Sequence, residues 1–213
     1  MTARIIIFGD IHGCHEEWQM LLNKVKATDK DRLISVGDIV CKGPSTKKSL
    51  DLAMSLPNLH CILGNHEVHL LRHWKHRNGG GNLKEYQRAA MEELGSRLDH
   101  YMRFIDGWPR YIDLPEALII HAGLRPGIPV EKQTLEDLVH LRTIGPEERP
   151  WYEFYEGEKL IVHGHWARQG LVVRENVIGL DSGCVYGREL SCIILPERKI
   201  ISVKAKKAYA PVN

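Results

Sequence analysis

The feature that most constrains this chain is a set of short apolar runs that each end in a cluster of polar residues. The runs cover residues 4–8, 33–36, 59–63, 117–120 and 159–162. The clusters that follow them are Gly9-Asp10, Gly37-Asp38, Gly64-Asn65-His66, His121-Ala-Gly123 and His163-Gly-His165. A short apolar run bounded by turn residues predicts a buried strand. The pattern therefore predicts a sheet whose strand ends carry polar side chains.

Helical patterns separate the first predicted strands. Apolar spacing predicts one helix at 16–26 and a second that opens at Pro44 and runs to about Ser55. Strands that alternate with helices predict an α/β fold with a parallel or mixed sheet. Ligands of such sheets bind beyond the carboxyl ends of the strands, and the polar clusters fall at those ends.

The middle and the end of the chain differ from this pattern. Residues from about 67 to 106 are mostly helical in pattern, and Asn78-Gly-Gly-Gly-Asn82 interrupts them with a predicted flexible loop. We interpret this region as a helical cap inserted into a single domain that spans residues 1–213. Short apolar runs between 172 and 203 predict a β-rich end.

The composition excludes several classes of protein. A chain of 213 residues buries one good core, and its net charge of +2 is too small for a polycation that binds nucleic acid. The five cysteines include no CxxC pair, so neither a disulfide framework nor a zinc ribbon is expected. The first apolar run is too short for a signal peptide or a membrane span, so we expect a soluble cytoplasmic protein.

The residue types at the strand ends suit a pair of metal ions. Asp10 and His12 lie two residues apart and can offer an oxygen and a nitrogen to one cation. The carboxylate of Asp38 has two oxygens and can bridge two cations. Further candidate ligands are Asn65, which could instead cap the helix that follows, His121 and His165. Oxygen and nitrogen ligands without thiolate suit manganese, iron, zinc or cobalt, and paired metals favour hydrolysis of phosphate esters or anhydrides.

These motifs resemble those of the calcineurin-like metallophosphoesterases. They read Gly9-Asp-Ile-His-Gly13, Gly37-Asp-Ile-Val-Cys-Lys-Gly43, Gly64-Asn-His-Glu67, His121-Ala-Gly123 and His163-Gly-His165. The resemblance spans roughly residues 5–195 and implies a four-layer α/β/β/α sandwich. Within the superfamily the chain is most similar to the phosphoprotein-phosphatase branch, and there to the bacterial symmetrical diadenosine tetraphosphatases and their relatives.

The resemblance also implies roles for individual residues. It implies one metal held by Asp10, His12 and Asp38, and a second held by Asp38, Asn65, His121 and His165. It makes His66 the general acid that protonates the leaving oxygen. Arg142 and Lys42 would bind phosphate beside the metals, and Arg125 is a further candidate whose alternative is a solvated loop arginine. His163 is interpreted as a hydrogen-bonded strand residue.

Three residues bear on the choice of substrate and favour one without settling it. Cys41 and Lys42 stand where the protein phosphatases of the branch have Asp and Arg, and Trp166 resembles the tetraphosphatases. These residues favour hydrolysis of diadenosine tetraphosphate to two ADP by metal-bound hydroxide. The alternative is a serine/threonine protein phosphatase or broad phosphomonoesterase on the same site. Because Cys41 cannot replace the carboxylate that orients the acid histidine in those relatives, another group must support His66 or its acidity is tuned differently.

Overall fold

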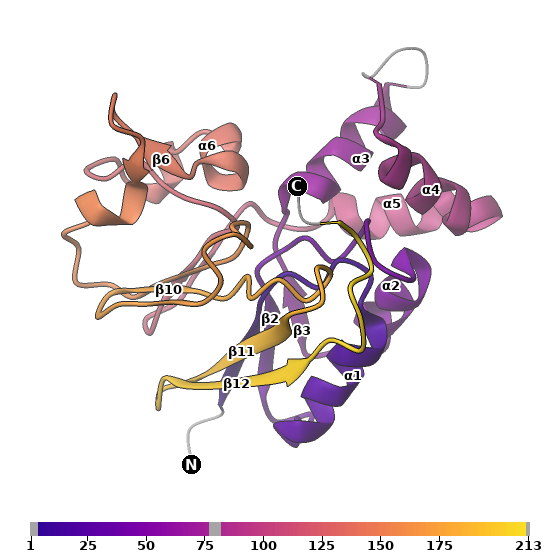
Figure 1. Cartoon of the computed structure of the whole chain (residues 1–213), viewed down its shortest axis with the longest axis horizontal. Coiled ribbons are helices and arrows are strands. Elements are labelled where there is room, and N and C mark those ends of the chain that lie inside the picture. Colours follow the sequence, from indigo (N-terminus) through magenta and orange to yellow (C-terminus); the bar gives the residue numbers. More distant parts are fainter. Residues whose placement is uncertain (1–3, 77–81, 212–213) are drawn as a thin grey trace.

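The computed structural model describes residues 4–76 and 82–211, and within them two five-stranded sheets form the centre of the fold (Figure 1). The first sheet has the order β12 (Lys199–Lys204), β11 (Glu189–Leu195), β1 (Ile5–Phe8), β2 (Arg32–Ser35) and β3 (Leu59–Cys61). The second has the order β4 (Ile112–Asp113), β5 (Leu118–Ile119), β8 (Ile161–His163), β10 (Val177–Gly179) and β9 (Val172–Val173). The predicted loop at Gly79–Gly81 lies outside the described residues.

Helices flank both sheets. They are α1 (His15–Lys24), α2 (Thr46–Ser55), α3 (Asn65–Lys75), α4 (Glu85–Leu94), α5 (Leu98–Asp106) and α6 (Leu135–His140). A small hairpin of β6 (Thr143–Ile144) and β7 (Arg149–Pro150) lies beside α6, and short 3-10 turns cover Gly95–Arg97, Val130–Lys132 and Trp151–Phe154. Figure 1 shows α1 and α2 along the first sheet, with α3, α4 and α5 grouped beyond α2 and α6 on the opposite side of the molecule.

Alternating side chains of the first sheet build two separate cores. Phe8 of β1 packs against Trp18 of α1, with ring centroids 6.1 Å apart. Its neighbour Ile7 points the other way and joins Ile119 of the second sheet. Since successive strand residues face opposite sides, β1 lies between a helical layer and a second sheet. Trp151 belongs to a third cluster on the second sheet, so the layers follow the expected α/β/β/α order.

Strand direction explains why the polar clusters come together. β1, β2 and β3 run parallel, and so do β5, β8 and β10. The residues that follow these strands therefore lie at the carboxyl edges of the two sheets. β11 is antiparallel to β1, so the first sheet is mixed. The alternation of strands and helices predicts a parallel or mixed sheet with polar residues at its strand ends, and the first sheet has both properties.

Two predicted details of the helical segments change. Ser45 is the N-cap of α2, and its hydroxyl accepts a hydrogen bond from the backbone N–H of Lys48 at 3.1 Å. Because this cap fixes the first turn, α2 begins at Thr46 and Pro44 precedes it. Gly64, not Asn65, is the N-cap of α3, so the side chain of Asn65 is free for another contact.

All five cysteines are buried free thiols. Within residues 4–76 and 82–211, no helix combines the length and apolar character needed to cross a lipid bilayer.

An ion pair fastens the start of β1 to the turn before β2. The buried carboxylate of Asp31 accepts hydrogen bonds from Arg4 Nε at 2.9 Å and Nη2 at 2.8 Å, and from the backbone N–H of Thr28 at 2.8 Å. The hydrogen bonds from Arg4 hold the pKa of Asp31 below its ordinary value of 3.8. The stabilisation by the carboxylate is therefore complete above pH 3.8 and is lost as the pH falls through the lower, folded-state pKa.

We predict that Asp31→Asn lowers the free energy of unfolding at pH 7 by about 2 kcal/mol, because a charge-assisted bidentate pair is lost. Its difference from the wild type should shrink as the pH falls below 3.8. Urea unfolding measures both effects. Asp29→Asn, two residues away and exposed, is the control and should match the wild type. Equal stability of the two variants at pH 7 would contradict this account.

Candidate metal centre

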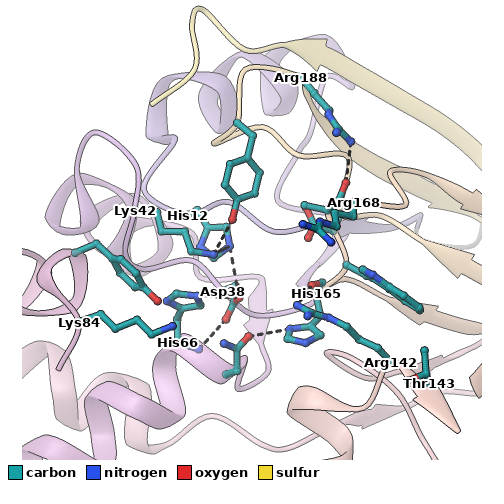
Figure 2. A pocket seen from close by; sticks show the side chains of 16 residues that line it. His12, Asp38, Lys42, His66, Lys84, Arg142, Thr143, His165, Arg168 and Arg188 are labelled. Atoms are coloured by element: carbon teal, nitrogen blue, oxygen red, sulfur yellow. Dashed lines mark hydrogen bonds and ion pairs between the residues drawn. The ribbon is translucent and has the colours of Figure 1, made fainter. Parts of the chain in front are cut away.

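Asp38 lies at the centre of the polar edge. Its carboxylate is 2% exposed, and Oδ2 lies 3.5 Å from His12 Nε2, 3.5 Å from His121 Nε2 and 3.9 Å from His66 Nε2. Asp38 and His12 both have positive φ, at 52° and 46°. Such a conformation costs free energy for a residue with a side chain, so the surrounding contacts must hold it in place. Figure 2 shows Asp38 between His12 and His66 on one side and His165 on the other.

His121 and His165, which follow β5 and β8 of the second sheet, complete the cluster. Asn65 Oδ1 lies 3.0 Å from His121 Nε2 and 2.9 Å from His165 Nδ1. The carboxylate of Asp10 accepts a hydrogen bond from the backbone N–H of His165 at 3.1 Å. The structure thus brings all six predicted ligands to one place.

Glycines make this close approach possible. A Cβ on Gly64 would overlap the carboxylate of Asp38, and one on Gly164 would overlap the carboxylate of Asp10. The glycine in each motif therefore lets one backbone segment touch the acid supplied by another strand.

Burial governs the charge of these groups. Removal from water, with Lys42 nearby, lowers the pKa of His12 to about 3. Burial acts in the same direction on His121, but the neighbouring carboxylates of Asp38 and Asp10 outweigh it and raise its pKa to about 10. Burial is also the main reason that the pKa of Asp10 lies well above its ordinary value. A buried cluster of this kind needs positive charge among its carboxylates.

The donor atoms fit a pair of cations. Around Asp38, two groups of three have ligand atoms within 4.8 Å of one another, His12 with Asp38 and His66, and Asp38 with His121 and His165. Asp38 belongs to both groups, as a bridging carboxylate would. Carboxylate, amide oxygen and imidazole without thiolate suit manganese, iron or zinc.

Two aromatic rings pack against His66, whose Nε2 faces the carboxylate of Asp38 at 3.9 Å. Its ring meets that of His12 edge-on at 4.8 Å and lies 5.4 Å from the ring of Tyr86. Its Nδ1 is buried and, among the residues that the structure describes, has no hydrogen-bond partner. Burial holds the pKa of His66 well below its ordinary value. The rings of His12 and Tyr86 and the carboxylate of Asp38 are thus the groups that surround the His66 side chain, where Cys41 supplies no carboxylate.

Cationic side chains surround a cleft of about 510 Å³ beside the cluster. Lys42 and Arg142, the two residues expected to bind phosphate, both line it. Burial alone would lower the pKa of Lys42, but Asp38 and Tyr186 outweigh it and the pKa lies above its ordinary value. Arg125 is not among the lining residues, and its guanidinium is paired with Asp137 at 2.9 Å. The structure thus places Arg125 in the alternative role of a loop arginine.

His163 has a structural position. Its side chain is 1% exposed, and Nδ1 lies 2.9 Å from the carbonyl oxygen of Gly164. The rings of Trp151 and Tyr152 lie 5.6 Å and 6.2 Å away. These contacts fit the hydrogen-bonded strand histidine that we expected.

Glu67 is a site residue that the sequence reasoning did not single out. Its carboxylate is 0% exposed and accepts hydrogen bonds from four backbone N–H groups, those of Gly64, Asp38, Ile39 and Val40, at 2.8–3.2 Å. One side chain thus caps α3 and also fixes the turn that carries Asp38. The N3 position after the cap of a predicted helix was the available signal.

Other cleft residues were missed because they come from distant segments. Asp181 lines the cleft, and burial raises its pKa to about 6. Further residues that line the cleft include Lys84, Tyr86, Arg168, Tyr186 and Arg188, together with Trp166 of the family signature. No local pattern marks them, since each lies on a loop or near a helix end whose position depends on the folded chain.

Comparison with known proteins agrees with the fold and the motifs. The family model for calcineurin-like phosphoesterases matches residues 3–201, and this chain belongs to that family. Members of the family use a dinuclear metal site. The asymmetrical bis(5'-nucleosyl)-tetraphosphatase PrpE of Geobacillus thermodenitrificans is 28% identical, over 97% of this chain and 96% of its own length. A symmetrical bis(5'-nucleosyl)-tetraphosphatase of Nitrosomonas europaea is 26% identical, over 92% of this chain and 96% of its own length.

Solved structures extend the comparison. A crystal structure assigned to a candidate diadenosine tetraphosphatase has a TM-score of 0.84 and 32% identity, and the match covers 96% of this chain and 95% of the other. A cold-active protein-tyrosine phosphatase of a Shewanella species has a TM-score of 0.61 and 15% identity, with 97% and 81% covered. The second likeness shows the fold alone.

The carboxylate of Glu67 yields a prediction about stability. Glu67→Gln keeps the size of the side chain but turns an amide N–H₂ toward backbone N–H donors. We expect the free energy of unfolding to fall by about 3 kcal/mol, because buried charge-assisted hydrogen bonds are lost. Thermal or urea unfolding of the metal-free protein measures this. Glu92→Gln, on the exposed surface of α4, is the matched control. A Glu67→Gln variant as stable as this control would refute the stabilising role of the Glu67 carboxylate.

Proposed function

We propose that the chain is a dinuclear-metal phosphohydrolase whose first metal is held by Asp10, His12 and Asp38 and whose second is held by Asp38, Asn65, His121 and His165. The observation that carries this proposal is the convergence of these six buried or half-buried side chains around Asp38. We assign manganese to the site by preference, with iron, zinc or cobalt as substitutes, since the donor set has no thiolate.

The bound metals would supply an activated water and offset the charge of the phosphate. Lys42 and Arg142 line the cleft and would hold the non-bridging phosphate oxygens. His66 would donate the proton at Nε2, the ring nitrogen that faces Asp38, to the leaving oxygen. Burial holds its pKa low in the free protein, and the negative charge of a bound phosphate would raise that pKa and favour the protonated ring. Low exposure of His66 and Asp38 keeps bulk water away from this transfer.

The proposed substrate is diadenosine tetraphosphate, cleaved symmetrically to two ADP. Water adds to one inner phosphorus while the central P–O bond breaks. Two observations support diadenosine tetraphosphate as the substrate, the tetraphosphatase relatives that match nearly the whole chain and the cations of the cleft. The relatives include asymmetrical and symmetrical enzymes, so the position of cleavage rests on the resemblance of Cys41 and Trp166 to the symmetrical ones. The cations of the cleft are Lys42, Lys84, Arg142, Arg168 and Arg188. A polyphosphate carries more negative charge than a phosphomonoester and can engage more of them.

We also propose how the chain is organised and where it works. Residues 1–213 form one domain, and the helices between about 67 and 106 are an insertion that borders the cleft through Lys84 and Tyr86. We assign the protein to the cytoplasm, where nucleoside polyphosphates occur and where its buried thiols would stay reduced.

Product analysis tests the substrate proposal. Manganese-loaded protein incubated with diadenosine tetraphosphate should release ADP as its sole nucleotide product, separated by ion-exchange chromatography. Equal amounts of ATP and AMP would instead show asymmetrical cleavage. No nucleotide product, together with rapid release of inorganic phosphate from phosphoserine peptides, would replace the proposal by the protein-phosphatase alternative.

Two substitutions separate proton transfer from metal binding. His66→Asn should lower kcat by roughly 10²- to 10⁴-fold, the usual contribution of a general acid, while two metals stay bound. Asp38→Asn should lower both kcat and the metal content, because it removes the shared carboxylate. Elemental analysis and steady-state kinetics measure these quantities, with His60→Asn on β3 as the control. Near wild-type kcat in His66→Asn would overturn the assignment of the acid.

A further inference from the structure

The ammonium group of Lys42 is held in an unusual way. Its Nζ donates a hydrogen bond to the hydroxyl of Tyr186 at 3.0 Å and lies 3.4 Å from His12 Nε2. The rings of Tyr186 and Tyr86 have their centroids 5.5 Å and 6.0 Å from the same nitrogen. Among residues 4–76 and 82–211, Lys42 forms no salt bridge with a carboxylate, so its charge is available to an anion in the cleft.

The backbone at Cys41 and Lys42 has an unusual conformation, which directs the Lys42 side chain. Cys41 and Lys42 have φ values of 71° and 66°, a left-handed conformation that is costly for residues with a side chain. The hydroxyl of Thr46 accepts a hydrogen bond from the backbone N–H of Cys41 at 2.9 Å and holds the turn. Figure 2 shows Lys42 extending beside His12 on the cleft side of Asp38.

Tyr186 is fixed from the other end of the chain. It forms an isolated β-bridge with Ala208, and the backbone N–H of Tyr209 donates to the carbonyl of Val185 at 2.9 Å. The tail is anchored in turn by Glu17, a buried residue of α1, whose Oε1 accepts from Tyr209 Oη at 2.7 Å. These contacts hold the backbone at Tyr186, and the hydrogen bond from Lys42 holds its hydroxyl beside the ammonium group.

We propose that Lys42 and Tyr186 act as a pair of adjacent donors that binds two oxygens of the substrate phosphate. This inference rests on the proposed function, since it assigns a further residue to the same site. The hydroxyl of Tyr186 uses a lone pair to accept from Lys42, which leaves its proton free to donate into the cleft. A lysine alone is a point charge, whereas the pair offers two donors 3.0 Å apart and resembles the fork of an arginine.

The key test is Tyr186→Phe, which removes the donor and keeps the ring. We expect the affinity of manganese-loaded protein for inorganic phosphate, measured by titration calorimetry, to fall roughly 10- to 100-fold, the usual effect of losing a hydrogen bond to a charged group. On diadenosine tetraphosphate we expect kcat/KM to fall by a similar factor. Tyr155→Phe, which deletes a hydroxyl bonded to the carbonyl of Lys159, is the matched control and should leave both quantities unchanged.

A double variant distinguishes a lost donor from a displaced loop. Lys42→Arg combined with Tyr186→Phe restores two donors on one side chain and should recover at least tenfold of the lost phosphate affinity. Phosphate affinity of Tyr186→Phe equal to that of Tyr155→Phe would overturn the inference, and so would a double variant without recovery. If the wild type hydrolyses no diadenosine tetraphosphate, the proposed function fails, while the phosphate titrations still decide the role of Tyr186.

Discussion

The structure depends on one buried carboxylate, that of Asp38, which faces three imidazoles at the seam between two sheets. Its exposure is 2%, so water cannot screen its charge, and only cations or protons within the cluster can balance it. Other parts of the fold serve to hold it there. The carboxylate of Glu67 accepts hydrogen bonds from the backbone N–H groups of Asp38 and Ile39. Gly64 has no side chain, so α3 can begin against the carboxylate of Asp38. The strained φ of Asp38 persists because these contacts leave no alternative.

Much of this centre could be predicted from the sequence, because local signals and strand direction act together. Each ligand follows a short apolar run, and parallel strands bring their ends to one edge, so spacing alone placed Asp10, Asp38 and Asn65 near one another. The two-sheet architecture was implied by family resemblance and not by the runs themselves. Hydrophobic alternation in a four-residue strand does not reveal which face meets a second sheet.

The errors and omissions have a common physical origin. A proline is common in a first helical turn, which is why the sequence places the start of the helix at Pro44. The structure starts the helix two residues later, because Ser45 is its N-cap. Arg125 follows a ligand motif closely, and its sequence context left open whether it binds phosphate; its guanidinium pairs with Asp137 and it does not line the cleft. Tyr186 reaches Lys42 across 144 residues because the C-terminal tail holds its loop, a contact that no local pattern encodes. The spacing of residues along the sequence does not predict contacts between segments that only the folded chain brings together.

The central claim is that Asp38 bridges two metal ions. Anomalous diffraction from crystals soaked in manganese tests it most directly, because the signal locates each ion independently of any activity. The account predicts two anomalous peaks on either side of the Asp38 carboxylate, one beside Asp10 and His12 and the other beside His121 and His165. A single peak, or peaks that lie away from Asp38, would contradict it.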